Sequence, residues 1–122
     1  MHNFKDLKVW QKSVDLAVGI YKLTSDFPNE EKFGMTSQMR RAGISISSNI
    51  AEGSAKSSKK AFSNALEISL GESFELETQI EICRRIGLVS DDLYNEFSES
   101  ITEIQKMILG LITSLHRQPL DT

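Results

Sequence analysis

The sequence predicts an all-α protein, an antiparallel up-down bundle of four helices, from its periodicity and its punctuation. Apolar residues recur every three or four positions in four successive segments, as on one face of a helix. No segment alternates apolar and polar residues as a half-buried strand does, and no Asn-Gly or Asp-Gly hairpin turn occurs. Within one domain, 1–122, we expect helices at about 6–25, 35–52, 58–86 and 91–117.

The first segment carries apolar residues on two sides. Its two seams are Leu7, Trp10, Val14, Ala17 and Tyr21, and Val9, Leu16, Ile20 and Leu23. A surface helix usually buries a stripe about 100° wide, and the two seams cover roughly twice that arc. Because large exposed apolar patches usually mark interfaces, we expect Trp10 to contact another subunit. The alternative is that this helix takes a central place in the bundle.

The second segment combines a narrow apolar stripe with a line of mostly neutral polar residues. The stripe is Met35, Met39, Ala42, Ile46 and Ile50, and the polar line is Gln38, Arg41, Ser45, Asn49 and Glu52. Such a line of amides and hydroxyls indicates hydrogen bonds to a neighbouring surface. Gly53 is typical of a residue that ends a helix. The stretch "EGSAKSSKK" lacks the second glycine and the preceding strand of a phosphate-binding loop.

The third segment has a wide apolar arc that includes carboxylates. Its two seams are Phe62, Leu66, Ser69, Ser73, Leu76, Ile80 and Cys83, and Ala61, Ala65, Ile68, Glu72, Glu75, Gln79, Ile82 and Ile86. Buried carboxylates need a cation or a donor, and Arg41 offers a two-pronged one. We expect the polar line to form a network with Glu72 and Glu75, between helices or across a subunit interface. The alternative is that both carboxylates reach solvent.

The third segment carries further apolar surface outside these seams. Leu70 and Phe74 lie on another side of the third helix and are candidate subunit contacts.

The fourth segment is a plain amphipathic helix. Its seam is Tyr94, Phe97, Ile101, Ile104, Ile108, Leu111 and Leu115. Gly87 is typical of a residue that follows a helix, and Ser90 before two aspartates is typical of an N-cap.

The composition limits the classes of partner. The chain has 122 residues, a net charge of −3 and one cysteine, Cys83. The acidic balance predicts no general attraction to nucleic acid or to anionic membranes. Contact with RNA or DNA would need the local basic residues Arg40, Arg41, Lys56, Lys59 and Lys60. The lone cysteine, the absence of a signal-peptide pattern and the short apolar runs predict a cytoplasmic protein without a membrane segment.

No group of residues predicts a reaction. The two histidines, His2 and His116, lie near the two ends, and no Glu-x-x-His pair occurs for a dimetal site. Cys83 lies on an apolar seam and is predicted to be a core residue. An enzyme would have to use a polar cleft of Glu72, Glu75, Arg41 and Asn49, and these carboxylates are better explained as partners of arginine. We therefore expect a protein that is not an enzyme and has no metal or cofactor.

Three stretches carry a resemblance to a known family. "FKDLKVWQKSVDLAVGIYKLTSDFP", "FGMTSQMRRAGISISSNIAEG" and "LEISLGESFELETQIEICRRIGLV" resemble the bacterial four-helix-bundle proteins of the 23S rRNA intervening-sequence family. The second stretch is the most specific, and the likeness covers nearly the whole chain. In the third, Gly71 and Glu75 match the family pattern, whereas Glu72 stands where serine is usual.

The resemblance implies a homopentameric ring. It also implies kinship with the accessory variability proteins of diversity-generating retroelements, which bind nucleic acid and a reverse transcriptase. We therefore expect a bacterial homo-oligomeric scaffold or accessory factor that contacts RNA, DNA or a nucleic-acid enzyme. The alternatives are a protein-binding adaptor with no nucleic-acid role and, in another class, the enzyme with a polar cleft.

Overall fold

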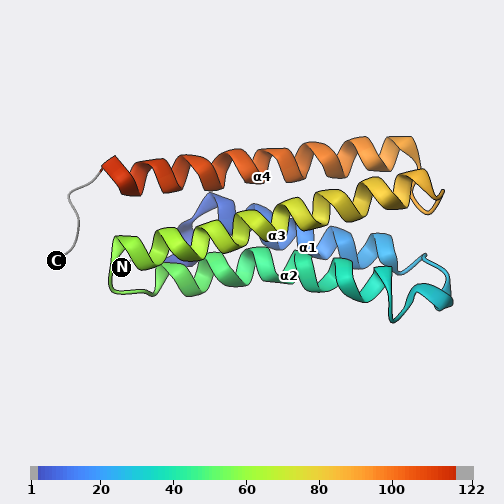
Figure 1. The fold of residues 1–122 in the computed structure, drawn as a ribbon, viewed down its shortest axis with the longest axis horizontal. Helices are drawn as coiled ribbons and strands as arrows, with labels where there is room; N and C mark the ends of the chain where they lie inside the picture. Colours follow the sequence, from blue (N-terminus) through green and yellow to red (C-terminus); the bar gives the residue numbers. More distant parts are fainter. Residues whose placement is uncertain (1–2, 118–122) are drawn as a thin grey trace.

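The structure is a computed structural model that describes residues 3–117. Its elements are η1 (Phe4–Asp6), α1 (Lys8–Thr24), η2 (Asn29–Glu31), α2 (Met35–Ser54), α3 (Lys59–Arg85) and α4 (Asp91–Arg117). The four α-helices run alternately in opposite directions along one long axis, and residues 3–117 contain no strand (Figure 1). The predicted up-down, all-α four-helix bundle is confirmed.

Consecutive helices lie side by side. The α1–α2 and α3–α4 connections lie at one end of the bundle, and the α2–α3 connection lies at the other (Figure 1). Helix α2 packs most extensively against α3, whereas α1 and α4 make the least contact of the neighbouring pairs. The side of the bundle between α1 and α4 is therefore its most open one.

Isoleucines from all four helices fill the core. The side chains of Ile20, Ile46 and Ile80 are fully buried, and Ile104 is almost so. On α1, the buried residues are Val9, Ser13, Leu16, Ile20 and Thr24. The second apolar seam predicted for this helix is therefore its core seam. The first seam lies at the boundary of the core, where Tyr21 remains 43% exposed.

Local capping explains the ends of α3 and the start of α4. The Ser58 hydroxyl accepts a hydrogen bond from the Ala61 amide at 3.1 Å, and Ser90 does the same for Leu93 at 3.2 Å. Gly87 has a φ of +83°, a conformation that a residue with a side chain rarely adopts. Ser90 and Gly87 therefore have the structural roles that the sequence predicts.

Gly53 does not end α2, contrary to the sequence-based expectation. The helix continues to Ser54, and Gly53 is buried within it. A Cβ atom at this position would lie 2.7 Å from Cβ of Ala65 and 3.0 Å from Cδ1 of Phe62. The glycine is there because α2 and α3 approach each other closely, and its lack of a side chain permits that approach.

Candidate interaction surfaces

An ion-pair cluster joins α2 to α3. Arg41 Nη1 lies 3.2 Å from Glu72 Oε2, and Arg41 Nη2 donates a hydrogen bond to Glu75. Gln79 Nε2 donates to the same Glu75 carboxylate at 3.4 Å. The hydrogen bond to Glu75 and the charge of Glu72 raise the pKa of Arg41 above its ordinary value. The structure thus brings Arg41, Glu72 and Glu75 together within one subunit.

The other members of the predicted network do not bridge the two helices. Asn49 Nδ2 donates to the Ser45 carbonyl oxygen at 2.8 Å and to its hydroxyl at 3.0 Å, so this pair stays on α2. Gln38 and Glu52 are exposed.

The two carboxylates are only partly buried, so the structure lies between the two alternatives that the sequence left open. The side chains of Glu72 and Glu75 are 18% and 41% exposed, and that of Arg41 is 54% exposed. The apolar arc of α3 is wider than the face that the core covers, so part of the arc, carboxylates included, reaches the surface.

Four exposed isoleucines surround this cluster. Ile44 on α2, Ile68 and Ile82 on α3, and Ile86 directly after α3 are 44%, 57%, 42% and 59% exposed. Ile44 follows Arg41 by three residues, and the α3 isoleucines are at helical spacing from Glu72 and Glu75, so all share one side of the bundle. We call these four residues the isoleucine face. The sequence indicated part of this face, because three of its four isoleucines belong to the second apolar seam predicted for the third helix.

A buried acceptor lies in the same seam. Gln79 is only 6% exposed, and its side-chain oxygen has no hydrogen-bond partner within the described part of the chain. An unsatisfied buried acceptor costs about 1–3 kcal/mol. A donor from a molecule that covers the isoleucine face would remove that cost.

The three predicted interface residues have different surroundings. Trp10 is half-buried against the core and meets the Phe4 ring edge-on, with ring centroids 5.0 Å apart. Leu70 is also half-buried against the core. Phe74 is 50% exposed and lies on α3 away from the isoleucine face. Phe74 is therefore the most accessible of the three for a partner.

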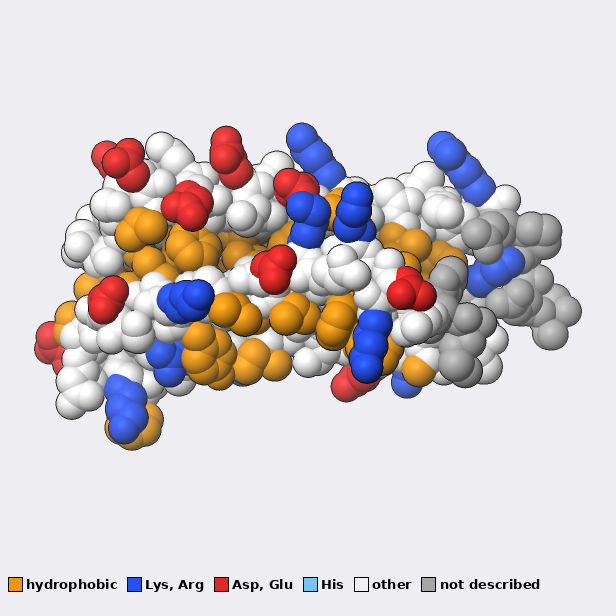
Figure 2. Space-filling view, turned by 180° about the vertical axis from the view of Figure 1, so that it is seen from behind, with side chains coloured by type: hydrophobic (Ala, Val, Ile, Leu, Met, Phe, Trp, Pro, Cys, Tyr) orange, Lys and Arg blue, Asp and Glu red, His pale blue; other side chains and the backbone are white. Residues whose placement is uncertain are grey.

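A groove of about 260 Å³ lies on the opposite side of the bundle, between α1 and α4. Its lining includes Lys12, Asp15 and Gly19 from α1 and Glu96, Phe97 and Glu103 from α4. Lys12 Nζ and Glu103 Oε1 form a 2.6 Å ion pair across it, and this contact raises the pKa of Lys12. Figure 2 views α1 from behind the bundle and shows bands of hydrophobic side chains along the molecule, beside rows of polar ones.

The predicted basic cluster is divided by the fold. Arg40 stacks on the Tyr21 ring at 4.4 Å and donates from Nε to Thr24 Oγ1 at 2.9 Å, so it joins α2 to α1. Arg41 belongs to the ion-pair cluster described above. Helix α2 ends at Ser54, about 20 Å along its axis from Arg41, and Lys56 follows that end. Only Lys56, Lys59 and Lys60 remain together, at the α2–α3 end of the bundle.

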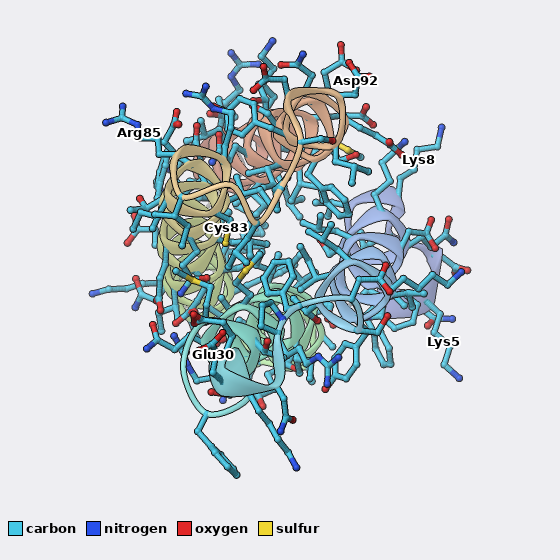
Figure 3. All side chains as sticks on the ribbon, turned by 90° about the vertical axis from the view of Figure 1, so that its right-hand side faces the viewer. Lys5, Lys8, Glu30, Cys83, Arg85 and Asp92 are labelled. Carbon is cyan, nitrogen blue, oxygen red and sulfur yellow. The ribbon has the colours of Figure 1, made fainter. Side chains whose placement is uncertain are left out.

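The described residues offer little for catalysis. Cys83 points into the core (Figure 3), and burial raises the pKa of its thiol to about 11, which opposes formation of the nucleophilic thiolate. Within residues 3–117, no three histidine, cysteine, aspartate or glutamate side chains are grouped as a metal site would require. The Ser63 hydroxyl lies 3.1 Å from His116 Nε2, and no carboxylate among the described residues is hydrogen-bonded to that histidine to orient it.

Within the described residues, no helix has both the length and the apolar character needed to cross a lipid bilayer.

Comparisons with known proteins agree with the fold. A family described as 23S rRNA-intervening sequence protein matches residues 5–110. The crystal structure of a protein of unknown function from the S23 ribosomal protein family of Bacteroides thetaiotaomicron VPI-5482 is similar, with a TM-score of 0.80 and 35% sequence identity. The similarity covers 86% of this chain and 95% of that one. No curated protein matches the chain.

Proposed function

The chain belongs to the 23S rRNA-intervening sequence protein family, and we propose that it is a non-enzymatic cytoplasmic scaffold that assembles with further copies of itself. The isoleucine face is the observation that carries this proposal. Fully burying an isoleucine side chain is worth about 1.5–3 kcal/mol, so four exposed ones form a substantial apolar surface. A second copy that covers them would keep that surface from water.

The charges at the centre of the isoleucine face suit an interface between copies. Arg41 contributes a cation, and Glu72 and Glu75 contribute anions that already satisfy it. A satisfied ion pair can be covered at a lower cost than an isolated charge. The homopentameric ring implied by the family resemblance is the assembly that we propose.

Mass measurement by light scattering tests the assembly. The subunit mass is 13.7 kDa, and we expect a multiple of it at micromolar concentration. Replacing both Ile68 and Ile82 by glutamine removes apolar surface without touching the core, so the mass should fall toward that of the monomer. Leu109→Gln is the matched control, because Leu109 is 48% exposed on α4. A monomeric wild-type protein contradicts the proposal.

Contact with RNA or DNA is a second proposed role, supported by the α2–α3 end of the bundle. Lys56 and Lys60 are exposed there, and neither forms a salt bridge within the described residues. A ring would repeat these cations in every subunit, which would offset the acidic charge of the whole chain locally. The partner would be a nucleic-acid backbone, alone or together with a nucleic-acid enzyme.

Titration of a labelled single-stranded RNA or DNA at several salt concentrations tests this second role. Each phosphate contact contributes about 0.7–0.9 to the slope of log affinity against log salt. Lys56→Gln with Lys60→Gln should therefore weaken binding and flatten the slope. Lys22→Gln is the control, because Lys22 is exposed at the far end of α1. If the wild-type protein assembles but binds neither nucleic acid, a protein-binding adaptor is the better description.

A further inference from the structure

The connection before α2 carries the most exposed large hydrophobic side chain among the described residues. Phe33 is 88% exposed, and the Lys32 ammonium lies 5.4 Å from the centre of its ring. Backbone hydrogen bonds of 2.9–3.1 Å join Pro28 to Glu31, Asn29 to Lys32 and Glu31 to Gly34, and they hold this turn in shape. The turn therefore presents a fixed knob, an aromatic ring with a cation beside it, which we call the Lys32–Phe33 tip.

The groove between α1 and α4 has a shape and an apolar lining that are complementary to the Phe33 ring of this tip. Its floor includes Leu16 and Ile104, which are 4% and 2% exposed, and the ring of Phe97 lines one side. Gly19 lies directly against that ring: a Cβ atom there would be only 3.2 Å from Phe97 Cε1, so a side chain at this position would crowd the ring. A volume of about 260 Å³ suits one aromatic side chain, since pockets for drug-sized ligands hold roughly 300–1,000 Å³.

The charges of the groove match those of the tip. Asp15 and Glu96 line the groove, and within residues 3–117 neither carboxylate makes a salt bridge. The groove's lysine, Lys12, is already engaged by Glu103. An incoming Lys32 would therefore meet two available carboxylates beside an apolar floor that accepts the ring.

We propose that the Lys32–Phe33 tip of one copy docks in the α1–α4 groove of a second copy. Phe33 packs against Phe97, and Lys32 pairs with Asp15 and Glu96. This inference rests on the proposed self-association and names its contact. The tip and the groove are different surfaces of the same chain, so the contact is head-to-tail and can be repeated around a closed ring.

The position of the isoleucine face fits the same contact. Helix α2 begins at Met35, directly after the tip, and it carries Ile44 on the side that it shares with α3. Viewed along the bundle, the α2–α3 side and the α1–α4 side lie opposite each other (Figure 3). A neighbour whose tip enters the groove can thus cover the α1–α4 side with its own isoleucine face.

The association constant, measured by sedimentation velocity over a concentration series, tests the docking. Truncating a central aromatic anchor usually weakens an interface by about tenfold or more, so Phe33→Ser should do so. Because Phe33 is almost fully exposed, its loss leaves the core intact, which a thermal melt followed by circular dichroism can verify. Leu109→Ser is the control, since it removes a 48% exposed apolar side chain from α4 that belongs neither to the tip nor to the lining of the groove.

Charge reversal identifies the two partners of the contact. Lys32→Glu and Glu96→Lys should each weaken association, and the chain that carries both changes should regain it, since each reversed tip then meets a reversed groove. If the wild-type protein assembles while Phe33→Ser and both reversals leave the association constant within twofold, the docking is overturned and self-association stands. A wild-type monomer overturns both.

Discussion

Replacing Gly53 by alanine tests whether close packing between α2 and α3 explains this glycine. Carbon atoms pack best at about 3.5–4.0 Å, so a Cβ placed 2.7 Å from Cβ of Ala65 forces the helices apart by about 1 Å. Ala65 has no rotatable side chain with which to withdraw, and the neighbouring Phe62 is 3% exposed. Such overpacking usually costs about 1–3 kcal/mol.

Helix propensity acts in the opposite direction. Alanine is better than glycine in a helix by about 1 kcal/mol, so part of the steric cost is offset. We expect Gly53→Ala to lower the free energy of unfolding by up to about 2 kcal/mol, because about 1 kcal/mol of the steric cost is offset. Gly110→Ala is the matched control: nothing lies within 4 Å of an added Cβ there, so the same change should stabilise the protein by about 0.5–1 kcal/mol.

Urea denaturation followed by circular dichroism measures both variants. All samples need one protein concentration, because association would stabilise the folded state by mass action. The midpoint should move while the slope stays constant, which identifies a change in stability rather than in the unfolded ensemble. If Gly53→Ala is as stable as Gly110→Ala, the close approach of α2 to α3 does not explain the glycine.

Four further substitutions, one of them a control, test contacts in the core and at its edge, and the same titration measures their effects on stability. Ser69→Ala removes the 2.8 Å hydrogen bond from its hydroxyl to the Ile46 carbonyl oxygen, and we expect a loss of about 1 kcal/mol; an unchanged midpoint would refute this. Arg40→Ala should lower stability by about 1–2 kcal/mol, because it removes both stacking and hydrogen bonds, and Arg85→Ala, at an exposed position, should cost less than about 0.5 kcal/mol. With its pKa raised from 9.0 to about 11, native Cys83 should resist iodoacetamide at pH 8 and react only after unfolding. Because the unfolded thiol ionises first, the stability that Cys83 contributes should fall as the pH rises from 9 toward 11, and Cys83→Ala should remove that part of the pH dependence.

The architecture could be predicted because each helix is marked by its own local sequence, through its apolar periodicity and its capping residues. Ser58, Ser90 and Gly87 act on their own backbone neighbours, so their roles can be read without knowledge of the tertiary structure. Gly53 could not be interpreted in this way. Its role depends on Ala65 and Phe62 on the next helix, and a glycine that ends a helix and one that lets two helices touch look alike in a sequence.

The candidate surfaces were only partly predictable for the same reason. Periodicity showed that α1 and α3 carry wide apolar arcs, but it could not tell which part of an arc meets the core. Trp10 therefore turned out to be half-buried, whereas Ile68 and Ile82 are exposed. The partners of Arg41 were predictable because a carboxylate at an apolar position needs a cation. The α1–α4 groove was not, since its two walls are about eighty residues apart in the chain.

Because short connections join adjacent helices, folding of one chain and association between chains should occur on different timescales. Helical bundles whose contacts are mostly local fold within microseconds to milliseconds. At micromolar concentration, typical association rate constants of about 10⁵–10⁷ M⁻¹ s⁻¹ make encounters between copies take roughly 0.1–10 s. A newly made chain would thus complete its fold long before it meets another. During that interval Phe33 and the isoleucine face are open to any apolar surface nearby, so the rate of synthesis and the local abundance of the protein become determinants of faithful assembly.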